Sequence, residues 1–193
     1  MHHATSPAHE GKSTEVVTSI IVKDTAQLNR IITRMTYQIL DNHNGAGKIA
    51  VVGIKTRGEE LAKCIRDKIK EIEGVEVPFG IVDPVLYRDD FIHTPEMPLS
   101  RYTQLPFDID AVTVILVDDV LGTGRTIRAA IDCIIDFGRP INIEVAVLCD
   151  SKAVEFPIIA KYIGRKTHVE LGKKLVVHLH ERDGEDKVYI VAK

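Results

Sequence analysis

Val112–Thr126 reads VTVILVDDVLGTGRT, and this stretch decides the fold. Its first six residues, Val112 to Val117, are almost entirely apolar, which is typical of a strand buried on both faces of a parallel sheet. Two acids and a glycine-containing loop follow, and the loop leads into a segment whose apolar residues recur at helical spacing. That segment stops at Gly138, with Pro140 beyond it, as helices commonly end. The stretch therefore predicts a strand, a loop at its carboxyl end and a helix.

The neighbouring segments repeat this arrangement. Apolar strands are predicted at 49–54 and 141–148, and a strand interrupted by its prolines at 75–87. Amphipathic helices are predicted after Asp24, which offers an N-cap, and after Gly58. Alternating strands and helices of this kind predict an α/β fold with a doubly wound, mostly parallel sheet.

The two ends of the chain differ from this centre. A β-like run at 16–22 and two runs at 174–180 and 186–191, joined by a hairpin signal at Arg182-Asp183-Gly184, predict a small second sheet. We call this small sheet and its connections the hood. The polar stretch 88–110 is longer than an ordinary connection and is therefore interpreted as a functional loop.

The predicted organisation is a single domain. Residues 1–14 are polar and are expected to form a disordered leader, and 15–193 the domain itself. Within it the core is expected at about 24–150, and the hood at about 151–193 together with the N-terminal strand.

The composition narrows the class of protein. Apolar residues make up 45% and charged residues 27% of the 193 residues, as in soluble globular proteins. A net charge of -3 gives no bulk attraction to nucleic acid or to an anionic membrane. No apolar run approaches the roughly 20 residues that span a bilayer. The cysteines, Cys64, Cys133 and Cys149, are odd in number and widely spaced, which indicates reduced thiols and a cytoplasmic location.

Polar residues gather where the predicted strands end. Ligands of doubly wound sheets bind outside the carboxyl ends of the strands. That rule places four segments along one rim: Lys55–Gly58, Tyr87–Asp90, Asp118–Thr126 and Asp150.

The acidic pair Asp118-Asp119 interrupts an apolar strand at this rim. A single Asp at a strand end usually caps a helix or faces solvent in a turn. Two adjacent buried carboxylates are costly unless they are paired, and two vicinal hydroxyls of a sugar would satisfy both. We therefore interpret the pair as the ligands of a ribose, and as indirect metal ligands through its hydroxyls or through water.

The loop after the acids has the features of a phosphate cradle. Its glycines allow close backbone approach, and the helix that follows presents free N–H groups to an anion. The predicted phosphate-binding residues here are Leu121, Gly122, Thr123, Gly124, Arg125 and Thr126. The lysine of a P-loop is missing, and Ile127 stands where a dinucleotide fingerprint needs its third glycine. The loop therefore predicts a site for a monophosphate.

A second loop supplies positive charge. Lys55, Thr56, Arg57 and Gly58 follow the strand at 49–54, and Arg88 stands at the start of the long loop. Opposite a ribose-phosphate site these cations suit a diphosphate, which predicts phosphoribosyl pyrophosphate as the ligand. Asp118 and Asp119 would favour the positive charge that develops on the ribose, whereas Arg88 and the loop cations, with Mg²⁺, would neutralise the departing pyrophosphate.

These residues together resemble the type I phosphoribosyltransferases, and most closely the PyrR family. The resemblance covers about 24–189 and is carried by four segments: Gly53–Gly58, Leu86–Asp90, Ile115–Thr126 and Phe137–Pro140. It implies the conversion of uracil and phosphoribosyl pyrophosphate to UMP and pyrophosphate, UMP-dependent binding of pyrimidine-operon mRNA, and dimers or tetramers. It also implies base-binding roles for Asp150, Ser151, Lys152 and Val154.

The chain departs from the family pattern in three places. Gly122 replaces an aromatic residue, Asp150–Glu155 lacks two arginines, and Gly164–Glu170 has a rewritten sequence. Because the last two segments belong to the base-recognising side, two alternatives stay open. One is a purine phosphoribosyltransferase acting on hypoxanthine or guanine. The other is a non-catalytic nucleotide sensor that binds RNA through a basic face formed by Arg30, Arg34, Arg139, Lys152, Lys161, Arg165 and Lys166.

Overall fold

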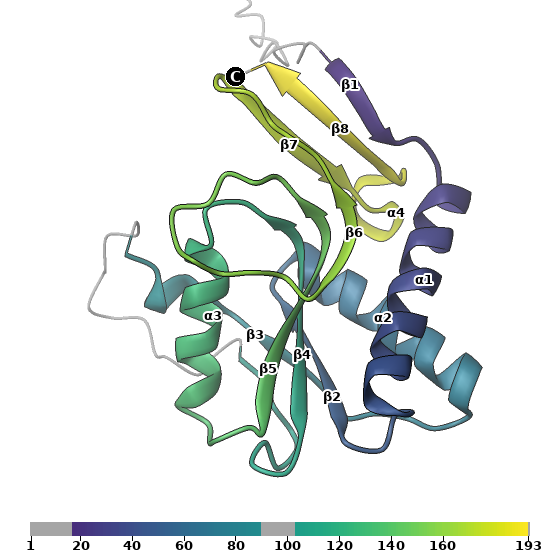
Figure 1. Ribbon diagram of the computed structural model, residues 1–193, viewed down its shortest axis with the longest axis vertical. Helices are drawn as coiled ribbons and strands as arrows, with labels where there is room; N and C mark the ends of the chain where they lie inside the picture. The colour runs from purple at the N-terminus through teal and green to yellow at the C-terminus, as the bar shows by residue number, and fades with distance from the viewer. Residues whose placement is uncertain (1–16, 90–102, 193) are drawn as a thin grey trace, which may run out of the picture.

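The computed structural model describes residues 17–89 and 103–192 (Figure 1). The predicted leader at 1–14 and most of the predicted loop at 88–110 lie outside these ranges. The elements in chain order are β1 Val17–Val22, α1 Thr25–His43, β2 Ile49–Ile54, α2 Arg57–Glu73, β3 Phe79–Val82, the 3-10 helix η1 Pro84–Tyr87, β4 Thr113–Leu121, α3 Arg125–Ile135, β5 Asn142–Asp150, β6 Tyr162–Lys166, β7 Lys173–His178, α4 His180–Asp183 and β8 Lys187–Ala192.

A parallel sheet forms the centre of the molecule, in the strand order β3-β2-β4-β5-β6. Every residue of β2 is buried, because helices cover both faces of the sheet. One apolar core lies under α1 and α2, and a second lies under α3. Figure 1 shows α1 and α2 on one side of the sheet and α3 on the other. The predicted doubly wound α/β fold is therefore confirmed.

The strand order reverses between β2 and β4. After β2 the chain passes through α2 to the edge strand β3, and then returns to the other side of β2 to form β4. The chain leaves the carboxyl ends of β2 and β4 in opposite directions, and such a reversal opens a crevice above the two strands. The loop at Lys55 and the acids of β4 both lie at this point.

The hood is an antiparallel sheet in the order β1-β8-β7, which confirms that the two ends of the chain form one small sheet. It lies above the carboxyl end of the central sheet (Figure 1), and β7 contacts β4. The connection between β7 and β8 differs from the predicted hairpin turn, because residues 180–183 form one turn of helix that ends at Gly184.

Other boundaries also differ from the prediction. The strand predicted at 75–87 is limited to Phe79–Val82, because the Asp83 carboxylate accepts the Val85 amide and starts a 3-10 helix at Pro84. β6 falls within the range assigned to the hood, but it pairs with β5 in the central sheet. Its sequence YIGRK has no strand-like alternation. Gly164 is needed there because a Cβ would collide with the Leu148 carbonyl.

Candidate functional site

The predicted strand ended at Val117, which placed the two acids beyond its end. In the structure β4 continues to Leu121 and contains both acids. Pairing with β5 continues past them to Leu121, so the backbone at Asp118 and Asp119 is held by the sheet. Only 7% of Asp118 is exposed, and its Oδ1 accepts the Asp119 amide at 2.9 Å. Burial, and then the charge of Asp119, raise the pKa of Asp118 well above its usual range. Burial likewise raises the pKa of Asp119, with the Arg57 charge opposing it.

The loop after β2 packs directly against these acids. A Cβ at Gly58 would stand 2.5 Å from the Val117 carbonyl oxygen and 3.1 Å from the Asp118 Cα, so only glycine allows this approach. The Lys55–Thr56 peptide bond is cis, and Lys55 forms an ion pair with Asp83 at 3.8 Å. Arg57 begins α2. The two segments that the sequence placed on one rim therefore touch.

Arg88 reaches the same place from the other side of the site. Its Nη1 donates a hydrogen bond to the Thr126 hydroxyl at 2.7 Å, and its charge opposes the rise in the Asp118 pKa. The guanidinium thus lies between the acid pair and the start of α3. Thr126 lines the hollow at the start of α3, and the action of Arg88 on the departing pyrophosphate stays a prediction.

A hollow of about 180 Å³ lies over the loop that starts α3. It is lined by Val120, Leu121, Gly122, Thr123, Gly124, Thr126 and Ile127. Gly124 has a φ of 90°, which favours glycine, and α3 begins at the next residue. The first amides of a helix have no partner within the helix and attract anions. The predicted cradle residues therefore surround one cavity at a helix N-terminus, with the exception of Arg125.

The Arg125 side chain points to other partners. It pairs with Asp89 and with Glu155, the latter at 2.8 Å, and it lies 5.1 Å from the centre of the Phe156 ring. Its amide donates to the Thr123 hydroxyl at 3.3 Å. Arg125 therefore joins the start of the long loop to the segment after β5, and these partners were not identified from the sequence because they are distant along the chain.

A second hollow of about 440 Å³ adjoins the first and shares Val120 and Thr123 with it. Its walls come from the segment after β5 and from the hood, and they include Ser151, Ala153, Glu155 and residues 169–175. The hood residues 171–175 were not predicted as site residues. In the sequence, what pointed to this region was the segment Gly164–Glu170 just before it, where the family pattern is rewritten.

The four predicted base-binding residues have different surroundings. Ser151 lines the second hollow, but its hydroxyl donates to the Leu121 carbonyl at 3.0 Å. The Asp150 carboxylate accepts the Lys152 amide, and the side chains of Lys152 and Val154 are exposed. Ser151 is therefore the member of this set that both borders the cavity and supports the phosphate loop.

The donors at the site suit a metal ion that the substrate helps to hold. Within residues 17–89 and 103–192 there is no group of three or more His, Cys, Asp or Glu side chains that could hold a metal ion. Asp118 and Asp119 offer carboxylate oxygens only, which fits Mg²⁺, an ion that keeps several waters and takes oxygen ligands from phosphates.

The helices in the described part of the chain include none long and apolar enough to cross a membrane.

Comparison with known proteins agrees with this geometry. A family profile described as "Phosphoribosyl transferase domain" matches residues 21–173. The chain is 46% identical over 162 residues to the "Bifunctional protein PyrR" of Deinococcus deserti, covering 84% of this chain and 88% of the relative. It is 45% identical over 175 residues to the protein of the same name from Elusimicrobium minutum, covering 90% of this chain and 97% of that one.

Solved structures share the fold. The hypoxanthine phosphoribosyltransferase of Trypanosoma cruzi matches with a TM-score of 0.66 at 13% identity, covering 91% of this chain and 97% of that one. The enzyme of the same name from Staphylococcus aureus matches with a TM-score of 0.63 at 18% identity, covering 91% and 92%. The fold is thus the type I phosphoribosyltransferase fold, as predicted.

Replacing Asp118 by Asn should stabilise the protein in a pH-dependent way. A raised folded-state pKa means that the stability contributed by protonated Asp118 is present at low pH and is lost as the pH rises through that pKa. Asn stays neutral and still offers an oxygen to the Asp119 amide. We expect Asp118→Asn to raise the free energy of unfolding by about 1–3 kcal/mol at neutral pH, and by much less near the usual carboxyl pKa.

Urea unfolding at several pH values measures this effect. Asp67→Asn is the control, because the Asp67 side chain is 64% exposed and its replacement should change stability by less than about 0.5 kcal/mol at each pH. A loss of stability in Asp118→Asn, or a gain that does not depend on pH, would contradict the account of the acid pair.

Proposed function

Because the chain belongs to the phosphoribosyltransferase family and, within it, to the PyrR family, we propose that it transfers the ribose 5-phosphate of phosphoribosyl pyrophosphate to uracil. The products are UMP and pyrophosphate. One observation carries the proposal: the acid pair of β4, with Asp118 buried and Asp119 partly buried, lies between a phosphate-sized hollow at the start of α3 and the cationic loop after β2.

Each part of that arrangement has a use in the reaction. The 5′-phosphate lies in the hollow lined by Thr123 and Thr126, and the ribose hydroxyls donate to Asp118 and Asp119. The pyrophosphate then extends toward Lys55 and Arg57. The bond between C1 of the ribose and the pyrophosphate oxygen breaks, and its electron pair leaves with the pyrophosphate. A bond from C1 to the N1 nitrogen of uracil forms, and the proton of N1 passes to the pyrophosphate or to water. The negative charge of the acids favours the cationic ribose, and the cations favour the departing pyrophosphate.

The site fits Mg²⁺ as the cofactor. The metal, when bound with the substrate, neutralises part of the pyrophosphate charge. Asp118 and Asp119 would contact it through ribose hydroxyls or water, since the described residues include no group of three or more His, Cys, Asp or Glu side chains that could hold the ion directly. Substrate binding also compensates the buried charge of both acids.

Uracil is favoured over a purine as the acceptor. The support is the close relationship to PyrR proteins along most of the chain, whereas the likeness to the hypoxanthine enzymes extends only to the fold. The second hollow is the place for the base, because it continues the phosphate hollow through Val120 and Thr123. The hood residues that line it are the ones that would contact the base.

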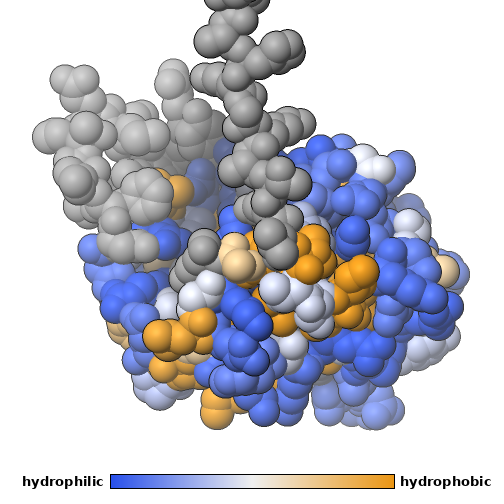
Figure 2. Space-filling model, turned by 90° about the horizontal axis from the view of Figure 1, so that it is seen from above, coloured by the Kyte–Doolittle hydropathy of each residue, from blue (hydrophilic) through white to orange (hydrophobic). Residues whose placement is uncertain are grey.

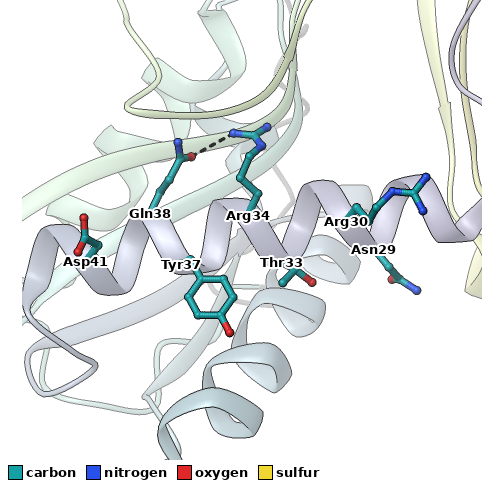
Figure 3. A pocket seen from close by; sticks show the side chains of 7 residues that line it. All are labelled: Asn29, Arg30, Thr33, Arg34, Tyr37, Gln38 and Asp41. Atoms are coloured by element: carbon teal, nitrogen blue, oxygen red, sulfur yellow. Dashed lines mark hydrogen bonds between the residues drawn. The ribbon is translucent and has the colours of Figure 1, made fainter.

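A regulatory role through RNA is a second candidate function. An open groove of about 790 Å³ runs along α1, and Figure 3 shows Arg30, Arg34 and Tyr37 among its side chains. Tyr37 is 55% exposed, and an exposed aromatic ring beside arginines suits the stacking of unpaired bases. Arg34 donates to the Ile163 and Gly164 carbonyls, which holds β6 and its exposed Arg165 next to the groove.

We also propose that the chain forms a homodimer or a tetramer. The hood strand β1 leaves Val17 and Ile20 about half exposed, at 45% and 55%. Figure 2 views the molecule from the hood end and shows apolar side chains gathered among polar ones. Apolar surface of this kind is commonly covered by a second subunit.

The substrate assignment is tested by supplying phosphoribosyl pyrophosphate, Mg²⁺ and one nucleobase at a time. We expect UMP from uracil and no nucleotide from hypoxanthine or guanine. The double variant Asp118→Asn, Asp119→Asn should lower kcat by at least about 100-fold, the scale of losing transition-state charge stabilisation. Asp67→Asn should retain full turnover. Product from a purine, or normal turnover by the double variant, would refute the assignment.

The RNA candidate predicts binding to a stem-loop RNA that UMP strengthens and salt weakens. Tyr37→Ala should weaken that binding by about 1–3 kcal/mol, the range measured for base stacking on an aromatic side chain. Tyr37→Phe should restore it, and neither change should affect UMP synthesis. Filter binding at low and high salt measures these effects, and an absence of binding by the unchanged protein at low salt would eliminate this role.

A further inference from the structure

An ion pair joins the hood to the loop of the proposed pyrophosphate site. Arg57 begins α2, directly after Lys55 and Thr56, and Asp183 ends α4 in the hood. The Arg57 Nη2 lies 3.3 Å from one carboxylate oxygen of Asp183 and 3.5 Å from the other. The two residues are 126 positions apart in the chain. The contact therefore connects two parts of the molecule that no short segment links.

Both partners are held in place. The Arg57 side chain is 32% exposed and the Asp183 side chain 17%. Asp183 Oδ2 also accepts the Leu179 amide at 2.9 Å, which fixes the carboxylate on its helical turn. Partial burial would raise the pKa of Asp183, but the Leu179 amide and the Arg57 guanidinium hold that pKa below its usual range. The carboxylate is charged and faces Arg57.

The guanidinium keeps a donor for a further anion. Its Nε is buried and has no hydrogen-bond partner among the described residues. A buried donor without a partner is costly, and the fork of an arginine can hold a carboxylate with one nitrogen and phosphate oxygens with the others. The positive charge of Arg57 opposes the rise in the Asp119 pKa, so the guanidinium acts on the acid pair. The Arg57 guanidinium therefore lies near the acid pair of the proposed substrate site.

We propose that Asp183 is a positioning residue that orients Arg57 toward the pyrophosphate of the substrate. The inference rests on the proposed function for the identity of that ligand. Asp183 itself does not touch the substrate. It acts by restricting the guanidinium to the orientation in which the remaining donors face the phosphate oxygens.

The Arg57–Asp183 ion pair also connects the part of the site proposed for the base with the part proposed for the pyrophosphate. The hood segment that leads into β7 lines the second hollow, where the base is placed, and β7 continues to the turn that carries Asp183. The hood element that borders the base is therefore the one that orients the arginine at the pyrophosphate. Asp183 makes the grip on the leaving group depend on the position of the hood.

The test compares two ligands that differ only in the pyrophosphate. Calorimetry in the presence of Mg²⁺ measures the binding of phosphoribosyl pyrophosphate and of ribose 5-phosphate to the full chain and to Asp183→Asn. Asn keeps an oxygen for the Leu179 amide but removes the charge that holds Arg57. We expect binding of phosphoribosyl pyrophosphate to weaken about tenfold, as for the loss of one charge-assisted hydrogen bond, and binding of ribose 5-phosphate to stay unchanged.

Two further variants separate positioning from a general effect on the hood. Glu181→Gln, on the same turn and exposed, should bind both ligands as the unchanged chain does. Asp183→Glu should recover part of the lost affinity. In turnover assays Asp183→Asn should raise the KM for phosphoribosyl pyrophosphate and leave the KM for uracil unchanged.

Several results would overturn the inference. These are equal weakening of both ligands, no change in either, tighter binding of phosphoribosyl pyrophosphate, or no binding of it by the unchanged chain. If the unchanged chain binds phosphoribosyl pyrophosphate and uses no nucleobase, the proposed function fails. The selective loss in Asp183→Asn would still support the positioning role.

Discussion

Two adjacent carboxylates inside a buried strand end are the constraint on which the rest of this structure depends. Asp118 and Asp119 stay in β4 because its pairing with β5 continues to Leu121. Their burial makes an apposed positive charge necessary. The strand reversal between β2 and β4 brings the cationic loop to them, and Gly58 allows the contact because it has no side chain. The fold thus supplies a ribose site and a pyrophosphate site from neighbouring strand ends.

The cations of the two predicted phosphate-binding loops already have partners within the protein. Lys55 pairs with Asp83, Arg57 with Asp183, and Arg125 with Asp89 and Glu155. Such pairs hold long side chains in defined orientations before the substrate arrives, which reduces the entropy lost on binding. They also link the site to three other parts of the chain: the hood, the start of the long loop and the segment after β5. The orientation of these cations therefore depends on segments that lie outside the phosphate-binding loops.

The core of the fold and the sugar-phosphate half of the site could be predicted from the sequence, because local pattern determines both. Apolar runs identify β2 and β4. The acids and glycines at 118–124 indicate a ribose site and a phosphate site by their residue types alone. The strand β6 could not be predicted, since its pairing with β5 and not its composition makes it a strand. Likewise Asp183, Glu155 and the hood residues 171–175 join the site only through the tertiary fold. The role of Arg125 was assigned from its neighbours in sequence, whereas its side chain faces distant acids.

The most direct test of the central claim is a crystal structure of the chain with phosphoribosyl pyrophosphate and Mg²⁺. The account predicts the 5′-phosphate in the hollow between Gly122 and Thr126, with the two ribose hydroxyls on Asp118 and Asp119 and the pyrophosphate beside Lys55 and Arg57. A ligand whose ribose lies away from the acid pair, or whose 5′-phosphate lies outside that hollow, would contradict it.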